Sequence, residues 1–591
     1  MNSKIILLFF ASTFIVHGFS QKVTTYKKWN PALDTLQVLE GQAWPGQVKN
    51  FYDRLPAKAE NTVRKEVWDL SENSAGLSLR FRTNANEIIV KYVVDGELQF
   101  QHMPATGVSG VDLYAKNSDG KWLWCAGRRS FGDTIVYRFK GMLSADEYKN
   151  PFDYTLYLPL YNSVKWLEIN VPDSSLFTPL PARKENPILV YGTSIAQGGC
   201  ATRPGLAWTN ILSRKLDRPV INLGFSGNGR LEKELISLIT EVNARLYVLD
   251  CLPNLTPENF SNKELKKRIV ESIKQLQNKK PGIPILLTDH DGYMDEDIDP
   301  GSKEDIQILN TTLKQEFDSL TAAGVKNIYL LTKKEIGQDI ESTVDGTHPN
   351  DIGMMNYANA YEKKIREVIN EPVGNISTTI PVTQHRDAAI YDWETRHNEI
   401  MARNKLHQPK LVLIGNSITH YWAGEPTAPI ARGVESCKKF FAAQNAVNLG
   451  FGWDRIENVL WRIYHGELDS ISPRQIVLMI GTNNLQYNSD KEIIEGLQFL
   501  IKAVKTKQPS ANILLMGILP RRDMEVRVAK LNAALAAIKF DAKVQYADAG
   551  KLFLKSDKKI DESLFADGLH PNEQGYMKLG EFISKRVARN P

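Results

Sequence analysis

The sequence predicts an α/β protein with two three-layer α/β/α domains built on parallel sheets, preceded by an N-terminal β-sandwich. Three observations lead to this fold class. Apolar runs of strand length alternate with helical stretches from Ile188 onward, the same alternation restarts after residue 385, and the residues before 186 hold short β-type runs without it. At 591 residues the chain is too long for a single domain.

The N-terminus is typical of a cleaved signal peptide, predicted at residues 1–20. Lys4 precedes an almost unbroken apolar stretch from Ile5 to Val16. This stretch is too short for a membrane helix, which needs about 20 residues. We therefore expect an exported protein, periplasmic or extracellular in a bacterium, without stable insertion in a membrane.

Residues 21–185 are predicted to form the β-sandwich. The runs Glu87–Val94 and Tyr154–Tyr161 are rich in β-branched and aromatic residues, and Asn117–Gly120 is a turn signal between such runs. Short strands at this spacing are typical of a sandwich. We expect no catalytic residues in this region, because His102 and Asp112 occur there only singly.

The two α/β domains are predicted at residues 186–370 and 386–591. Between them, residues 371–385 hold Pro, Gly, Ser and Thr without periodicity and are predicted to be a linker. The repeated order of strands and helices indicates an internal duplication. The expected strands are Ile188–Tyr191, Val220–Leu223, Leu246–Leu249, Ile283–Leu287 and Ile328–Leu331, then Leu411–Ile414, Ala446–Leu449, Ile476–Ile480, Ile513–Ile518 and Val544–Ala547.

Composition narrows the possible partners. The net charge of +5 on a chain that is 24% charged is close to balance, so no nucleic-acid partner is expected. The four cysteines are too few for a disulfide scaffold and lack the spacing of metal ligands, so no metal or other cofactor is expected. Cys200 and Cys251 flank candidate site residues, and either a disulfide or two buried thiols would suit them.

Four short motifs recur in the same order in both α/β domains, and the spacing from serine to histidine differs by one residue between the copies. In the first copy they are Gly192-Thr193-Ser194, Asn222-Leu223-Gly224, Asn254 in Leu-Pro-Asn, and Asp345-Gly346-Thr347-His348-Pro349-Asn350. In the second copy they are Gly415-Asn416-Ser417, Asn448-Leu449-Gly450, Gly481-Thr482-Asn483-Asn484, and Asp567-Gly568-Leu569-His570-Pro571-Asn572.

Acyl transfer explains these residue types. A serine hydroxyl is a weak nucleophile until a nearby histidine takes its proton. An aspartate holds the imidazole in the right tautomer and stabilises its charged form. Each serine follows the first strand of its domain, at the edge where ligands bind in open α/β sheets. Asn350 and Asn572 also suit helix N-caps, so capping is an alternative purpose for their loops.

Both copies resemble the SGNH (GDSL-type) hydrolase superfamily, whose four blocks supply Ser, Gly, Asn and His. The resemblance implies flavodoxin-like domains and ester hydrolysis without a metal. The implied catalytic residues are Ser194, Asp345, His348, Ser417, Asp567 and His570. The implied oxyanion-hole residues are Ser194, Gly224, Asn254, Ser417, Gly450 and Asn483.

Two parts of the chain have narrower resemblances. The second copy, with "NLGFGWDRIENVLWRI", is similar to the catalytic subunits of platelet-activating-factor acetylhydrolases. The β region with "GVDLY" resembles the Gly-x-Asp-Leu-Tyr domain that precedes some bacterial SGNH esterases. The sequence departs from the superfamily pattern at Thr193 and Asn416, which replace the Asp of Gly-Asp-Ser, and at Leu-Pro-Asn in place of Gly-x-Asn.

The residues after each serine differ. Ala196–Gly199 are small apart from Gln197 and predict an open floor at the first site, whereas Thr419-His420-Tyr421-Trp422 predict a tighter aromatic pocket at the second. Tyr421, Trp422 and Trp453 are candidates for stacking on sugar rings, with core packing as the alternative. We expect the two sites to act independently and to differ in ester specificity.

The sequence favours an exported esterase with two catalytic sites that removes short acyl groups, in the first place acetyl, from an acylated carbohydrate. Two alternatives stay open: a hydrolase of lipid or short-chain acyl esters, and a glycan-binding protein with inactive hydrolase folds. The sequence does not indicate the oligomeric state or the sugar.

Overall fold

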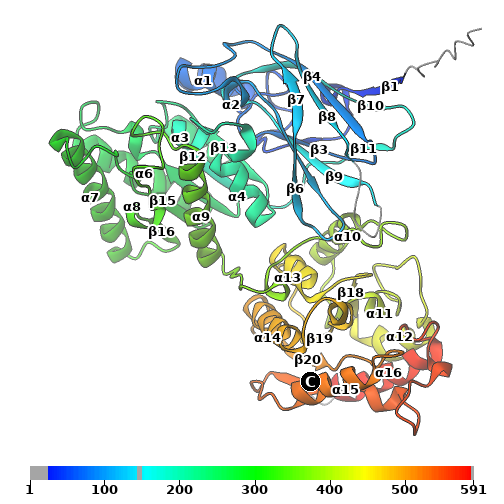
Figure 1. The fold of residues 1–591 in the computed structure, drawn as a ribbon. Coiled ribbons are helices and arrows are strands. Elements are labelled where there is room, and N and C mark those ends of the chain that lie inside the picture. Colours follow the sequence, from blue (N-terminus) through cyan, green and yellow to red (C-terminus); the bar gives the residue numbers. More distant parts are fainter. Residues whose placement is uncertain (1–23, 143–149, 588–591) are drawn as a thin grey trace, which may run out of the picture.

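The computed structural model describes residues 24–142 and 150–587 and contains three sheet systems (Figure 1). The predicted signal peptide lies outside the described residues. Two antiparallel sheets form the sandwich, and two five-stranded parallel sheets form the two α/β domains. The predicted fold class is thereby confirmed. Within the described chain, no helix has the length and apolar character needed to cross a membrane.

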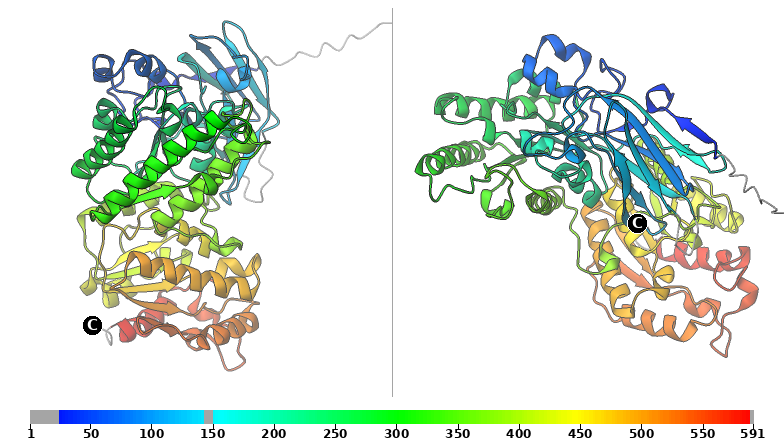
Figure 2. Two further views of the ribbon diagram at one scale, coloured as in Figure 1. Left: turned by 90° about the vertical axis from the view of Figure 1, so that its left-hand side faces the viewer. Right: turned by 45° about the horizontal axis from the view of Figure 1, so that its top comes forward.

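The sandwich packs one antiparallel sheet on another around an aromatic and aliphatic core (Figure 2). One sheet has the order β1-β10-β4-β8-β7, and the other has the order β11-β3-β9-β5-β6 with β2 beside β3. The strands are β1 Tyr26–Trp29, β2 Leu39–Glu40, β3 Ser78–Thr83, β4 Glu87–Val94, β5 Asp112–Lys116, β6 Trp122–Cys125, β7 Gly127–Ser130, β8 Ile135–Lys140, β9 Phe152–Tyr157, β10 Val164–Pro172 and β11 Phe177–Pro179.

The first α/β domain has strand order β13-β12-β14-β15-β16, and the second repeats it as β18-β17-β19-β20-β21. Each sheet therefore follows the flavodoxin-like order 2-1-3-4-5. The strands are β12 Ile188–Gly192, β13 Val220–Gly224, β14 Leu246–Asp250, β15 Ile285–Thr288 and β16 Ile328–Leu331, then β17 Leu411–Gly415, β18 Val447–Gly450, β19 Gln475–Met479, β20 Asn512–Met516 and β21 Val544–Ala547. All ten lie within a few residues of their predicted positions.

Helices cover both faces of each parallel sheet, which explains why the strands are apolar on both sides. In the first domain they are α4 Trp208–Leu216 and α9 Asp351–Val368 on one face, and α5 Lys233–Ile239, α6 Asn262–Lys279 and α7 Pro300–Ala322 on the other. In the second they are α12 Val434–Phe441 and α16 Glu573–Val587, and α10 Trp393–Leu406, α13 Ile456–Tyr464, α14 Asp490–Lys507 and α15 Glu525–Ala536.

One segment inside the range predicted for the sandwich packs elsewhere. Trp44, Leu55, Val67 and Trp68, around the short helix α1 (Lys65–Ser71), are buried against the sheet of the first α/β domain. The sequence of this segment does not indicate which sheet it packs against, because that sheet begins only at Ile188. The segment between β2 and β3 therefore packs as part of the first α/β domain and not as part of the sandwich.

The Gly-x-Asp-Leu-Tyr motif fastens the sandwich to the first α/β domain. Asp112 on β5 is 4% exposed and accepts hydrogen bonds from the side chain of Arg203 and from the N–H of Gly205 at 3.0 Å. Tyr114 accepts from Arg203 at 2.7 Å. Because Arg203 and Gly205 lie shortly after the nucleophile loop, the motif braces the chain that leads away from the first site.

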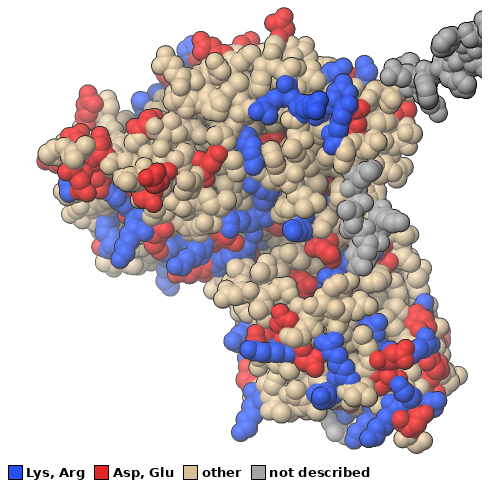
Figure 3. All heavy atoms as spheres, viewed as in Figure 1, with Lys and Arg blue, Asp and Glu red and all other residues tan. Residues whose placement is uncertain are grey.

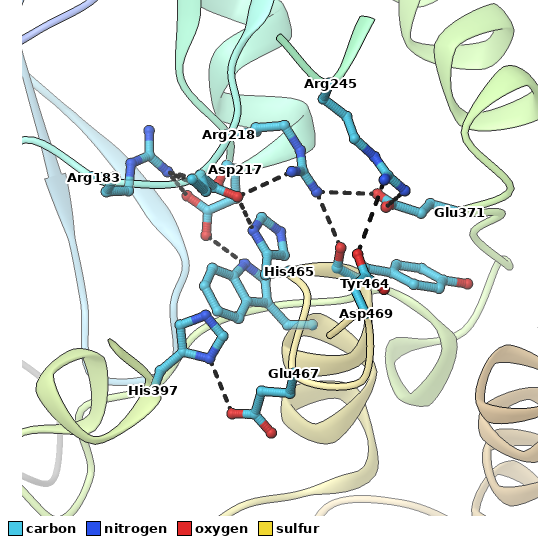
Figure 4. Close-up of polar contacts among 12 residues, drawn as sticks. Arg183, Asp217, Arg218, Arg245, Glu371, His397, Tyr464, His465, Glu467 and Asp469 are labelled. Carbon is cyan, nitrogen blue, oxygen red and sulfur yellow. Dashed lines mark hydrogen bonds and ion pairs between the residues drawn. The ribbon is translucent and has the colours of Figure 1, made fainter. Parts of the chain in front are cut away.

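The predicted linker is buried at both ends, at Glu371 and at residues 383–385, and partly exposed between them. Glu371 is 3% exposed and pairs with Arg218 at 3.3 Å and with Arg245 at 3.2 Å (Figure 4). It also pairs with Lys507 at 3.7 Å. Arg218 also donates to the carbonyl of Tyr464 at 3.1 Å. These bonds join the first α/β domain to the second.

A second set of polar contacts completes this interface. Glu185 pairs with His465 at 2.8 Å, and the Trp461 indole, stacked on His465 with 3.7 Å between ring centroids, donates to Asp217 at 2.9 Å. Arg80 of β3 binds both oxygens of Glu394 on α10 at 3.1 and 2.8 Å. The sandwich and both α/β domains therefore share one polar interface. On the outer face shown in Figure 3, by contrast, cationic and anionic side chains are intermingled.

We expect Glu371→Ala to lower the Tm of the protein by about 6 °C or more. Removing the carboxylate would leave Arg218 buried beside fewer acceptors, and breaking a buried pair costs about 3–5 kcal/mol. Differential scanning calorimetry checks this. The control is Asp69→Ala, because Asp69 and its partner Lys65 are both exposed and such surface pairs contribute little to stability. Equal shifts in Tm for the two variants would contradict a stabilising role for Glu371.

Candidate active site

Each candidate nucleophile begins a one-turn helix at the carboxyl end of the first strand of its domain. Ser194 starts α3 (Ser194–Gln197) after β12, and Ser417 starts α11 (Ser417–His420) after β17. The preceding residues cap these helices: the side chain of Thr193 accepts from the N–H of Ile195, and that of Asn416 from the N–H of Ile418. Thr and Asn both suit an N-cap, which explains how this chain does without the aspartate of Gly-Asp-Ser.

The structure brings serine, histidine and aspartate together in both domains. In the first, Ser194 Oγ lies 2.9 Å from His348 Nε2, and His348 Nδ1 lies 2.8 Å from Asp345 Oδ2. In the second, Ser417 Oγ lies 2.8 Å from His570 Nε2, and His570 Nδ1 lies 2.8 Å from Asp567 Oδ2. Each Ser–His–Asp triad has the geometry in which a histidine can take the serine proton.

The aspartate of each Asp-x-x-His loop fixes both the conformation of the loop and the orientation of the imidazole. Asp345 Oδ1 accepts from the N–H of Thr347 at 3.1 Å and of His348 at 2.7 Å, which leaves Oδ2 for the imidazole. Asp567 repeats the arrangement. Asn350 also caps α9, with its side chain accepting from the N–H of Ile352. The capping purpose and the triad geometry therefore coexist in one loop.

Charge and burial act in opposite directions on these groups. Although partial burial would raise the pKa of Asp345 and of Asp567, hydrogen bonds from their histidines lower both pKa values below the ordinary range. Burial lowers the pKa of His570 from its usual value, only partly offset by its bond to Asp567. The second site therefore favours a neutral imidazole facing an ionised carboxylate.

Gly224 and Gly450 lie where the nucleophile helix touches the neighbouring strand. A Cβ on Gly224 would collide with the N atom of Gln197, and one on Gly450 with the N atom of His420. Their N–H groups are already used: each donates at 2.8 Å to the side-chain oxygen of the asparagine two residues earlier, Asn222 or Asn448. The expectation that these two glycines donate to an oxyanion is therefore corrected, and their role is the close approach.

The turn after Gly224 leaves one N–H pointing elsewhere. The N–H groups of Phe225, Ser226, Asn228 and Gly229 donate to Gly192 O, Gln197 Oε1, Phe225 O and Asn254 Oδ1. Within the described residues, Gly227 is the one member of this turn whose N–H has no such acceptor, and its φ of 69° is left-handed. Trp453, with a φ of 62°, occupies the equivalent position in the second domain.

The two asparagines of the third repeated motif, Asn254 and Asn483, each contact the turn that follows the site glycine of their own domain. Asn254, in the 3-10 turn Leu252–Asn254 after β14, accepts from the N–H of Gly229 at 3.1 Å, which directs its NH₂ group away from that contact. Asn483, in the turn Thr482–Gln486 after β19, donates to the carbonyl of Asp454 at 2.9 Å with one of its two N–H bonds. In each domain, the asparagine side chain therefore keeps at least one N–H that is not used in its contact with the turn.

A supporting residue three positions after each serine was not anticipated. Gln197 accepts from the N–H of Ser226 at 3.0 Å, and His420 Nδ1 accepts from the N–H of Gly452 at 3.1 Å. Burial lowers the pKa of His420 to about 2, so that it stays neutral and can accept. The equal offset from the two serines was the available signal, but Gln and His share no motif that would draw attention to it.

The three aromatic candidates of the second site have different surroundings. Trp422 is 1% exposed and packs in the core with Phe441 and Tyr576, so its predicted stacking role is wrong. Tyr421 lies beside the triad, its ring centroid 5.3 Å from that of His570, and its hydroxyl donates to Asp387 at 3.2 Å. Trp453 is 40% exposed, so part of its side chain lies at the surface.

The first site takes its aromatic wall from the sandwich. The Tyr161 hydroxyl donates to the carbonyl of Ser194 at 3.2 Å, the His102 ring centroid lies 6.0 Å from that of His348, and Phe100 meets Tyr161 edge-on at 5.8 Å. The small residues after Ser194 therefore do not leave an open floor. Sequence reasoning missed this wall because its residues are far along the chain and belong to another domain.

Cys200 and Cys251 are buried free thiols in the structure. Burial raises the pKa of both. They therefore pack as small apolar residues at the edges of the first site.

The fold and site geometry agree with comparisons to known proteins. Models of the GDSL-like lipase/acylhydrolase family match residues 185–366 and 413–578, and a model of the N-terminus of SGNH-hydrolase-type esterases matches residues 26–177. The platelet-activating factor acetylhydrolase IB subunit alpha2 of Homo sapiens is 31% identical over 208 residues, which is 34% of this chain and 86% of that protein. The alpha1 subunit of the same species is 28% identical over 205 residues, 33% of this chain and 83% of that protein.

A solved structure extends the likeness beyond one α/β domain. A protein from Bacteroides ovatus, described as a GDSL-like lipase, has 31% identity and a TM-score of 0.53, covering 58% of this chain and 98% of its own. With two family models matched in tandem, the chain belongs to the GDSL-like lipase/acylhydrolase family and carries two of its domains behind an SGNH-esterase N-terminal domain.

Proposed function

We propose that this protein is an exported serine esterase whose two sites remove short acyl groups, in the first place acetyl, from a glycan. The observation that carries the proposal is the Ser–His–Asp chain built twice with nearly identical distances. In each site the histidine takes the proton of the serine hydroxyl as its oxygen attacks the ester carbonyl. The histidine then returns the proton to the leaving alcohol, and water releases the acid from the acyl-enzyme.

The tetrahedral intermediate needs donors at its oxyanion. We assign them to the backbone N–H of each serine, to the amide of Asn254 or Asn483, and to the turn at Gly227 or Trp453. In the first site, Gly227 is favoured because its neighbours in the turn already donate elsewhere. A single donor of this kind is worth about 3–4 kcal/mol in the transition state.

Two features support the proposed substrate class. The name of the acetylhydrolase relatives favours an acetyl ester. Tyr161 beside Ser194 and Tyr421 beside His570 would suit the apolar faces of sugar rings, as would the exposed Trp453 in the turn after Gly450. Hydrolysis of aryl acetate, longer aryl esters and acetylated polysaccharide separates the candidates: preference for longer aryl esters favours a lipid hydrolase, and no turnover of any leaves a glycan-binding protein.

We expect Ser194→Ala and Ser417→Ala each to remove one activity and leave the other. Each triad is complete within its own domain, so neither serine depends on the other. The two single variants should differ in their relative rates on the three substrates, and the double variant should be inert. Loss of all turnover in a folded single variant would contradict independent sites, and equal losses on every substrate would contradict different specificities.

The sandwich wall should set the specificity of the first site. In a Ser417→Ala background, Phe100→Ala and His102→Ala should lower kcat/KM for acetylated polysaccharide by about 10-fold while changing that for aryl acetate little, since lost pocket contacts are worth about 1–3 kcal/mol. Trp166→Ala, an exposed aromatic on β10, is the matched control and should have no effect. Similar losses on both substrates would refute a specificity role.

The second site should stay active in mild acid. Its base must be neutral, and burial lowers the pKa of His570, so the acidic limb of kcat/KM in a Ser194→Ala background should lie below about pH 6.5. Arg432, which pairs with Asp567 at 3.3 Å, also lowers the pKa of His570. Arg432→Gln should therefore move the limb to higher pH; a pH–rate profile with an unmoved or lower limb would count against this account.

A further inference from the structure

Two buried arginines contact the same place in the two α/β domains. Arg54 is 2% exposed and donates from Nη1 to the carbonyls of Asn222 at 3.1 Å and Gly224 at 2.8 Å. Arg396 is 4% exposed and donates from Nη2 to the carbonyl of Asn448 at 3.1 Å and from Nε to that of Gly450 at 2.9 Å. Each guanidinium thus binds the two carbonyls that flank the residue before the site glycine.

The two arginines reach this place from unrelated parts of the chain. Arg54 lies in the segment ahead of α1, with strands β3 to β11 of the sandwich between it and β12, whereas Arg396 is on α10, close before β17. Duplication of the strands and motifs alone therefore does not account for the shared contact, because the two arginines do not occupy equivalent positions in the chain. Both guanidinium groups also lie over an aromatic ring, Phe225 at 4.9 Å and Phe451 at 5.3 Å.

Among the described residues, the hydrogen-bond acceptors of these two guanidinium groups are backbone carbonyls. Arg54 also donates to Asn73 and Leu70, and Arg396 also donates to Pro426. Within the described residues, neither forms an ion pair with a carboxylate, unlike the buried Arg462, which binds Asp454 and Glu467.

Burying a charge without a counter-ion is costly, and a neutral donor could make some of the same bonds. Burial lowers the pKa of Arg54 to about 9 and that of Arg396 to about 10, so both remain cationic at neutral pH. A charge kept in both domains at this cost suggests a use for the charge itself.

The position of each arginine relative to the nucleophilic serine indicates what its charge does. In the sheet, Gly224 pairs with Gly192 and Gly450 with Gly415, and the nucleophilic serine follows two residues after Gly192 or Gly415. The carbonyl bound by the arginine is the last one before the turn of Gly227 or Trp453. We propose that Arg54 and Arg396 are positioning residues that hold this turn and add a fixed positive charge behind the oxyanion of their site.

The inference rests on the proposed function, because an oxyanion forms only if the serines attack an ester carbonyl. When the serine attacks, negative charge moves onto the former carbonyl oxygen of the ester. A charge that is fixed before the reaction stabilises that oxygen without any reorganisation at the moment of attack. The arginine itself neither gains nor loses a proton in this scheme.

The first site is tested in a Ser417→Ala chain. Arg54→Gln should lower kcat for aryl acetate about 10- to 100-fold and change KM less than about threefold, because the interaction strengthens only in the transition state. Arg54→Lys, which keeps the charge but not the planar fork, should recover part of the lost kcat. Arg128→Gln, an exposed arginine on β7, is the matched control and should behave as the parent chain does.

The outcomes separate the two ideas. No turnover in the parent Ser417→Ala chain would refute the proposed function of the first site. An active parent whose Arg54→Gln variant keeps kcat within twofold, with or without a lower Tm, would overturn the positioning role. If circular dichroism shows that Arg54→Gln is unfolded, the second site decides, through Arg396→Gln in a Ser194→Ala chain. At least a fivefold loss of kcat at unchanged KM supports the role there, and a kcat within twofold of the parent overturns it.

Discussion

The close approach of backbone to backbone at Gly224 and Gly450 is the constraint on which both sites depend. No side chain fits between the nucleophile helix and the neighbouring strand at these positions. Because the helix rests directly on the strand, its first residue lies at the sheet edge, within reach of the histidine loop. The N–H of each glycine is held by the preceding asparagine, so the asparagine, the glycine and the helix form one rigid unit.

Around this unit the two domains are built differently. The first site borrows Phe100, His102 and Tyr161 from the sandwich, whereas the second is walled by Tyr421 and Asp387 of its own domain. Burial raises the pKa of Asp387 to about 6, so the second wall includes a carboxyl that titrates in mild acid and the first has no such group among these residues. The chemistry is thus repeated while the surroundings are not.

The fold and the triads were predictable because their signals are local. Strands such as β12 and β17 are continuous apolar runs, and the Asp-x-x-His loops carry their own hydrogen bonds within four residues. What the sequence did not reveal depends on distant partners. Trp422 looks like a site aromatic until the packing of α12 and α16 around it is known, and Arg54 looks like an ordinary charged residue until β13 lies beside it. Gly224 was placed correctly beside the nucleophile but given the wrong task, since sequence does not show where an N–H points.

This division between local and distant parts explains how two copies can keep one chemistry and still differ in specificity. The four motifs and the sheet register place the serine, the histidine and the aspartate of each site within one domain. The walls come from segments that are inserted before the first strand or follow the nucleophile, and these can change without moving the triad. The polar contacts of Glu185, Asp217 and Glu371, together with the Arg80–Glu394 pair, hold the sandwich, the first domain and the second domain in one arrangement and thereby fix the position of the first wall. Breaking that interface should therefore disturb the first site, whose wall belongs to another domain, more than the second, whose wall is its own.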